Sequence, residues 1–280
     1  MSLAFLFPGQ GSQSVGMGAD SFNRYPEIVE QANQQLGYSL SELCLEDPDS
    51  KLGQTEFTQP ALYLTSFLDA KSRIEDGSQP AFSAGHSVGE FAALATAGAM
   101  SFLDGLRMVS KRGEIMSQVG GGGMAAVIGL DADGIRRTLD SISADQIDLA
   151  NFNSPVQIVI SGPASQIKDT LVPLKEAGAK LVVPLKVSGA FHSRMMSEPA
   201  REFGDFLKEF SFSSPQTPVY SNVEAVPYSG VDAIPGLLVR QIHSPVCWTE
   251  TILKMRQDGA TEFVECGPGV VLNKLLRQIQ

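Results

Sequence analysis

Short apolar runs alternate with longer amphipathic stretches along the chain. The runs Leu3–Phe7, Ala81–Ala84 and Val219–Val223 are too short for helices, and each predicts a buried strand. Tyr25–Leu36 predicts a helix, and Ala61–Ala70 is apolar nearly all round, which is typical of a helix packed inside the protein. Strands that alternate with helices in this way predict an α/β fold.

The rest of the chain extends this pattern. Ser101 and Asp104 form a capping box, which marks the start of a helix that carries Arg112 on the same row as apolar side chains. Thr58–Pro60 is expected to lead into the helix at 61–70, and Ile74–Pro80 to be a polar loop. The other predicted elements are helices at Leu40–Leu45, Glu90–Ala97, Met195–Phe210, Ile234–Gln241 and Thr249–Arg256, and an edge strand at Thr261–Glu265.

The middle of the chain shows a separate order of predicted strands and helices. Four glycines, Gly120–Gly123, predict a flexible hinge, and the elements after them follow the β-α-β-β-α-β order of the ferredoxin-like plan. We therefore expect an inserted subdomain at residues 123–187 and a larger body formed by 1–122 and 188–280. The insert is predicted to contain strands at Met124–Gly129, Ile147–Asn153, Val156–Ser161 and Lys180–Pro184, and helices at Asp131–Ser141 and Ser165–Ala177.

A candidate nucleophile lies between the predicted strand at 81–84 and the helix at 90–97. There the sequence reads Gly85-His86-Ser87-Val88-Gly89. Strand, tight turn and helix is the order of a nucleophile elbow, whose strained turn leaves no room for side chains on either side of the serine. The N-terminus of the following helix favours negative charge. We therefore predict that Ser87 is a nucleophile.

A serine nucleophile needs a base, and the chain holds three histidines. His86 is beside Ser87 on the turn and is expected to point away from it. His243 is at a predicted helix end and is the reserve candidate. His192, in a loop before the helix at 195–210, is the predicted base, although a lone histidine is more often structural.

Two further positions carry candidate chemistry. Gln10 follows the first strand in a glycine-rich turn that lacks the lysine and the spacing of a phosphate-binding loop. A serine acyl transferase needs a second loop to supply one backbone N–H to its oxyanion hole, and Gln10 is the natural candidate. Arg112 either snorkels from the edge of its helix or is buried and pairs with an anion, such as a substrate carboxylate.

Composition narrows the class of protein. The chain has 280 residues, is 43% hydrophobic and carries a net charge of −10 without a basic cluster, which argues against a nucleic-acid partner. No apolar run approaches the ~20 residues of a membrane span, and Met1–Gln13 does not resemble a signal peptide, so we expect a cytoplasmic protein. Cys44, Cys247 and Cys266 are too widely spaced to indicate a disulfide framework or a zinc site, and no metal is expected.

Six motifs are spread over nearly the whole chain. They are FPGQGSQ at Phe7–Gln13, GHSVGE at Gly85–Glu90, KRGEIM at Lys111–Met116, NFNSP at Asn151–Pro155, GAFHSRMM at Gly189–Met196 and ECGPGVVL at Glu265–Leu272. In kind and in order they resemble malonyl-CoA:acyl-carrier-protein transacylases and the related acyltransferases of polyketide synthases. Agreement of six motifs in order is far more specific than any one of them.

The resemblance implies ping-pong acyl transfer on an α/β-hydrolase-like body with a ferredoxin-like insert. Ser87 attacks the thioester of malonyl-CoA while His192 takes its proton, and the backbone N–H groups of Gln10 and Val88 hold the oxyanion. The malonyl group then passes to the phosphopantetheine thiol of an acyl carrier protein. Malonyl-CoA and the carrier protein are thus the implied partners, no resident cofactor is implied, and we expect a monomer.

The other site residues are carried over from the same resemblance. Arg112 pairs with the free malonyl carboxylate, and the main-chain carbonyl of Gln241 orients His192 in place of a triad acid. Phe191 matches the malonyl-selective form of its loop, in which the phenylalanine crowds an α-methyl branch of the acyl group. Such a pocket contact is worth only about 1–3 kcal/mol, so we expect some transfer from methylmalonyl-CoA as well. Asn153 is assigned to substrate binding.

Finer features of the resemblance concern the pathway. The chain resembles free-standing acyltransferases that serve polyketide synthases in trans at Leu43–Asp49, at Thr55–Tyr63 and in ending at Gln280. We therefore favour a role in polyketide synthesis over one in fatty acid synthesis. Two other functions stay open. A thioesterase would use the same serine and histidine without needing Arg112, and a carrier-protein docking module with a dead site would require Ser87 to be unreactive.

Overall fold

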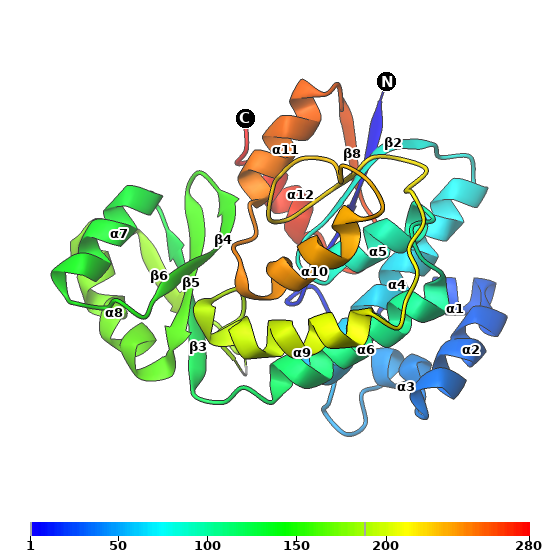
Figure 1. Ribbon diagram of the computed structural model, residues 1–280, viewed down its shortest axis with the longest axis horizontal. Coiled ribbons are helices and arrows are strands. Elements are labelled where there is room, and N and C mark those ends of the chain that lie inside the picture. The colour runs from blue at the N-terminus through cyan, green and yellow to red at the C-terminus, as the bar shows by residue number, and fades with distance from the viewer. Residues whose placement is uncertain (1, 188) are drawn as a thin grey trace.

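The structure is a computed structural model that describes residues 2–187 and 189–280, and it contains two four-stranded sheets (Figure 1). The first sheet is parallel in its paired strands and has the order β7-β2-β1-β8. Its strands are β1 (Leu3–Phe7), β2 (Pro80–Gly85), β7 (Val219–Tyr220) and β8 (Glu262–Glu265).

Side chains of β1 alternate between two cores, as a central strand covered on both faces requires. Phe5 and Phe7 belong to one core with Phe91 of α5, and Ala4 and Leu6 belong to another with Trp248 of α11. The helices around this sheet are α1 (Ala19–Arg24), α2 (Pro26–Leu36), α3 (Leu40–Leu45), α4 (Thr55–Glu75), α5 (Gly89–Thr96), α6 (Phe102–Ser117), α9 (Ser197–Leu207), α10 (Ala233–His243), α11 (Trp248–Gln257) and α12 (Val271–Leu276), with a 3₁₀ turn at Arg194–Met196.

The second sheet is antiparallel, with the order β4-β5-β3-β6. Val127, Ile135 and Ile160 pack in a separate core between this sheet and its two helices, whereas Met124 and Val159 join the core of the first sheet. One face of the sheet is thus turned to the rest of the molecule. The elements are β3 (Gly122–Ile128), α7 (Ala132–Ser141), β4 (Asp148–Ser154), β5 (Gln157–Pro163), α8 (Ala164–Glu176) and β6 (Leu181–Pro184).

The α/β class predicted from the sequence is confirmed, and most predicted elements lie within a few residues of their observed bounds. Ser101 is the N-cap of α6, as predicted, because its hydroxyl accepts from the Asp104 N–H. The Asp104 carboxylate accepts from the same hydroxyl, which differs from the reciprocal bond to a backbone N–H that defines a capping box. Among the described helices, none is long and apolar enough to cross a membrane.

Some predicted bounds are wrong. Helix α4 runs from Thr55 to Glu75 and includes Pro60, so the lead-in is already helical and the loop begins only at Asp76. Pro60 is the sixth residue of the helix, where its missing N–H removes a single intrahelical bond, and burial of most of the helix compensates. Strand β7 stops at Tyr220 instead of Val223, and the short helices α1 and α12 were not predicted.

The four-glycine hinge is also partly wrong, because Gly122 and Gly123 lie inside β3. A Cβ at Gly122 would come within 2.3 Å of the backbone nitrogen of Ala190, in the loop that carries Phe191 and His192. Glycine is therefore needed at position 122 for the close approach of two backbone segments, and not for flexibility.

We predict that Gly122→Ala destabilises the protein by about 1–3 kcal/mol, because the added methyl group forces this loop away from β3. Gly120→Ala is the matched control, since a Cβ at Gly120 meets no atom within 4 Å, and its effect should stay within about 0.5 kcal/mol. Urea unfolding of the two variants measures the difference. Equal stabilities would contradict the packing argument.

Candidate active site

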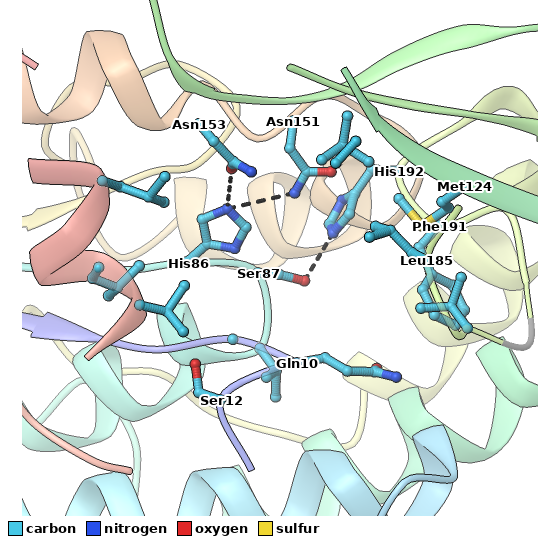
Figure 2. A pocket seen from close by; sticks show the side chains of 18 of the residues that line it. Gln10, Ser12, His86, Ser87, Met124, Asn151, Asn153, Leu185, Phe191 and His192 are labelled. Atoms are coloured by element: carbon cyan, nitrogen blue, oxygen red, sulfur yellow. Dashed lines mark hydrogen bonds between the residues drawn. The ribbon is translucent and has the colours of Figure 1, made fainter. Parts of the chain in front are cut away.

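The first sheet brings three loops to one edge. Strands β1, β2 and β7 are parallel neighbours, so the segments after Phe7, Gly85 and Tyr220 all leave the sheet on the same side. Loops at the carboxyl ends of parallel strands are where open α/β sheets bind ligands. A cavity of about 260 Å³ lies there, walled on its other side by the second sheet (Figure 2).

The segment at the end of β2 forms a strained elbow. Ser87 has φ +52°, a left-handed conformation that non-glycine residues rarely adopt. The turn is so tight that a Cβ at Gly85 would lie 1.9 Å from the carbonyl carbon of Gly89. Asn222 holds the elbow from the neighbouring loop, because its amide donates to the Gly85 carbonyl at 2.5 Å and accepts from the Ser87 N–H at 2.7 Å.

The elbow directs the Ser87 hydroxyl at His192. Ser87 Oγ lies 2.8 Å from Nε2 of His192, whose Nδ1 lies 2.8 Å from the main-chain carbonyl of Gln241 (Figure 2). A carbonyl can only accept, so Nδ1 carries the proton of the neutral ring and Nε2 is free to accept from the serine. The pair is thus arranged for proton transfer from Ser87 to His192.

The imidazole is held in its neutral form. His192 is buried, and burial together with the positive charge of Arg112 lowers its pKa to about 3. A neutral base is therefore available throughout the physiological pH range.

Arg112 is only 1% exposed, which excludes the alternative that it snorkels to the surface. Its guanidinium donates to Oε1 of Gln59 at 2.7 Å, to Oε1 of Gln241 at 2.8 Å and to Ser87 Oγ at 3.2 Å. All three acceptors are neutral oxygens, and no carboxylate of the described residues forms an ion pair with it. Burial lowers the pKa of Arg112 to about 10, which still leaves it charged at neutral pH.

Gln10 and Val88 line the same cavity as the serine. Neither backbone N–H donates an intramolecular hydrogen bond among the described residues, so both remain available to an incoming oxyanion. The side chain of Gln10 donates to Thr55 Oγ1 at 3.3 Å, which anchors its loop to the start of α4.

The remaining predicted positions are Phe191, Asn153 and His243, and they differ in whether they line the cavity. Phe191 is buried and lines the cavity. Asn153 also lines it, and its side-chain oxygen lies 2.8 Å from Nε2 of His86, which is turned toward β4 and away from the serine (Figure 2). The reserve candidate His243 does not line this cavity.

Sequence reasoning missed three polar residues of the site, namely Gln59, Glu90 and Asn222. Asn222 follows the end of β7, and a polar residue after a buried strand next to β2 is a signal that could have identified it. Glu90 is a fully buried acid on the otherwise apolar start of α5, and burial raises its pKa to about 7. The signal was an acidic side chain in an alanine-rich helix.

The family assignment agrees with this geometry. Residues 4–279 match the model of the acyl transferase domain. The chain belongs to this family. It is 51% identical to the polyketide biosynthesis protein ThaF of Burkholderia thailandensis, covering 99% of this chain but only 24% of ThaF. It is 46% identical to the polyketide biosynthesis malonyl CoA-acyl carrier protein transacylase BaeC of Bacillus velezensis, covering 99% of this chain and 96% of BaeC.

Solved structures agree with this assignment. A malonyl-transacylase in complex with the acyl carrier protein of a type II polyketide synthase superposes with a TM-score of 0.95 at 37% identity, over 100% of this chain and 93% of the other. Family members named malonyl CoA-acyl carrier protein transacylase without a polyketide label share 38–40% identity with this chain.

The neutral buried imidazole predicts a pH-dependent stability. His192 has a pKa of about 3 in the folded protein against 6.5 when unfolded, so between these values only the unfolded chain takes up the proton. Its contribution to stability is full above pH 6.5 and is lost as the pH falls toward 3, at about 1.4 kcal/mol per pH unit. Urea unfolding of His192→Asn between pH 6.5 and 4 should show a flatter decline than the wild type.

The matched control is His243→Asn, because the ring of His243 is far less buried and its pKa is less affected. This variant should keep most of the wild-type slope. If His192→Asn also kept it, the imidazole would not be buried in neutral form.

Proposed function

We propose that this protein transfers a malonyl group from malonyl-CoA, through an ester on Ser87, to the phosphopantetheine thiol of an acyl carrier protein. The observation that carries the proposal is the buried guanidinium of Arg112, which lies 3.2 Å from the nucleophile and whose hydrogen-bond partners among the described residues are all neutral. A buried positive charge beside a reactive serine suits an acyl group with its own carboxylate. The names of several relatives support the same substrate.

In the first half-reaction, Ser87 Oγ attacks the thioester carbonyl carbon while its proton passes to Nε2 of His192, 2.8 Å away. The carbonyl electron pair moves to oxygen, and the backbone N–H groups of Gln10 and Val88 stabilise this oxyanion. The oxyanion then re-forms the carbonyl, the carbon–sulfur bond breaks, and the coenzyme A thiolate takes the proton from His192.

The second half-reaction runs through the same atoms. The carrier-protein thiol gives its proton to Nε2 of His192 and attacks the ester carbonyl of the acylated serine. The carbon–oxygen bond then breaks, and Ser87 recovers its proton from the imidazolium. The main-chain carbonyl of Gln241 accepts from Nδ1 throughout and stabilises the positive charge that forms on the ring. The reaction is complete with these groups and needs no resident metal or cofactor.

Acyl selectivity is assigned to two side chains. Arg112 favours acyl groups that end in a carboxylate, and Phe191 narrows the cavity next to His192 against an α-methyl branch. Asn153, held by His86, is assigned to binding the remainder of the substrate in the same cavity.

The architecture and the cellular role are proposed on related grounds. The strand order β4-β5-β3-β6 and the helices α7 and α8 support a ferredoxin-like subdomain at residues 123–187, inserted in an α/β-hydrolase-like body. The names of ThaF and BaeC support polyketide synthesis over fatty acid synthesis. We infer a monomer that works in the cytoplasm, where an acyl carrier protein is its partner.

We predict that incubation with malonyl-CoA adds one malonyl group to the wild-type protein, as seen in its intact mass, and adds none to Ser87→Ala. Addition of a phosphopantetheinylated carrier protein should then remove the adduct and acylate the carrier. Steady release of free malonate without an adduct would instead identify a hydrolase. Comparison of a polyketide carrier with a fatty acid carrier distinguishes the two pathways.

Arg112→Ala should lower kcat/KM for malonyl-CoA on the order of a hundredfold or more, because a buried charge pair is worth about 3–5 kcal/mol. The same variant should use acetyl-CoA as well as or better than the wild type, since no unpaired charge remains in the cavity. Arg107→Ala, on the exposed face of the same helix, is the matched control and should behave as wild type. Full malonyl activity in Arg112→Ala would contradict the proposed role.

A further inference from the structure

Glu90 is a second buried ionisable group in the site, and the proposed acyl transfer does not use it. It lies on α5 three residues after the nucleophile and is 1% exposed. One carboxylate oxygen accepts from the Asn222 N–H at 3.2 Å and from the Tyr228 hydroxyl, and the other accepts from the Gln241 side-chain amide at 2.5 Å. Both oxygens are therefore occupied by donors.

Two of these donors lead directly to reacting groups. Asn222 is the residue that holds the strained elbow through the Gly85 carbonyl and the Ser87 N–H. Gln241 accepts from Arg112 with its side-chain oxygen and from His192 with its main-chain oxygen. Glu90 thus contacts the supports of the nucleophile, the base and the arginine at the same time.

The Glu90 carboxylate and the main-chain carbonyl of Ser87 together determine which way the Gln241 amide faces, because its NH₂ group donates to both. An amide has one donor end and one acceptor end, and a carboxylate can only accept. With Glu90 ionised, the NH₂ group of Gln241 must face Glu90, so its oxygen must face Arg112. If the amide turned over, two donors would meet at Arg112 and two acceptors at Glu90, which buried groups tolerate poorly.

The distance between the two charges matters as well. Because Gln241 stands between them, Glu90 offsets the positive charge of Arg112 without occupying the guanidinium edge that a substrate carboxylate would use. A direct Glu90–Arg112 ion pair would instead compete with the substrate.

We propose that Glu90 is a positioning residue, whose carboxylate helps to fix the orientation of the Gln241 side-chain amide and thereby holds Arg112 next to Ser87. The inference rests on the proposed malonyl transfer. It adds that Glu90 contributes to the selectivity of the site for malonyl over other acyl groups. Glu90 does not touch the reacting atoms.

The titration of Glu90 supplies a readout. Burial raises its pKa to about 7, so it gains its charge as the pH rises through this value. The titratable and charged groups that face it are Tyr228, whose pKa is raised well above 10, and Arg112, whose pKa is about 10, so both keep their charge state near pH 7. His192 stays neutral down to about pH 3. A fall in kcat/KM as the pH drops below about 7 would therefore report protonation of Glu90. We call this fall the acidic limb of the pH profile.

The test compares Glu90→Gln with Tyr228→Phe, which removes one donor to Glu90 but leaves Gln241 in place. Glu90→Gln should lower kcat/KM for malonyl-CoA on the order of tenfold to a hundredfold, the range for losing a hydrogen bond to a charged group. It should also lower the preference for malonyl-CoA over acetyl-CoA and abolish the acidic limb. Tyr228→Phe should keep the preference and the limb.

A purely structural role would leave the malonyl-to-acetyl preference and the pH profile of Glu90→Gln unchanged, and that result would overturn the proposal. If the wild type itself formed no malonyl adduct, the proposed function would fail first, so the two failures are distinguishable.

The double variant Glu90→Gln, Gln241→Glu covers the case in which Glu90→Gln does not fold. It restores one carboxylate–amide pair but places the carboxylate directly on Arg112. We expect its melting temperature to recover toward that of the wild type while malonyl transfer stays low. Recovery of malonyl transfer along with stability would overturn the proposal, because the order of the two groups would then be unimportant.

Discussion

A buried guanidinium whose hydrogen-bond partners are all neutral is the constraint on which this site depends. The two terminal nitrogens of Arg112 donate to Gln59, Gln241 and Ser87, whereas its Nε is buried with no hydrogen-bond partner among the described residues and its charge forms no ion pair there. Taking such a charge out of water is costly unless an anion compensates it. Under the proposed function, the carboxylate of the malonyl group supplies this anion. When no substrate is bound, the negative charge of Glu90, one amide away, offsets part of the cost.

The fold makes this arrangement possible by bringing distant segments to one sheet edge. Ser87 and Asn222 come from loops after adjacent parallel strands, and α10 supplies Gln241, whose side-chain amide donates to the Ser87 carbonyl at 3.0 Å. The second sheet then covers the cavity with Met124 and Val159, which keeps water from the guanidinium. Without that cover, the charge would be solvated, and the selectivity between acyl groups that we propose for Arg112 would be much weaker.

The sequence predicted the parts of the site that depend on local structure. The elbow around Ser87 is specified by two glycines between a strand and a helix, and these requirements act within five residues. The sequence of its helix could not decide whether Arg112 is buried, because burial depends on which distant segments pack over the side chain. Asn222 and Glu90 were missed for the same reason, since their bonds cross more than a hundred positions in sequence. Pro60 misled the prediction of α4 because tertiary packing outweighs local propensity there.

Under the proposed function, the closeness of Arg112 to Ser87 and His192 links recognition of the malonyl carboxylate to the strength of the base. The charge of Arg112 helps to lower the pKa of His192, and its guanidinium donates to the hydroxyl that must attack. A carboxylate that pairs with the guanidinium cancels part of this charge and draws the donor away from Ser87. The imidazole then becomes a stronger base and the hydroxyl a freer nucleophile. An acyl group without a carboxylate leaves both effects in place, so discrimination acts on the chemical step as well as on binding.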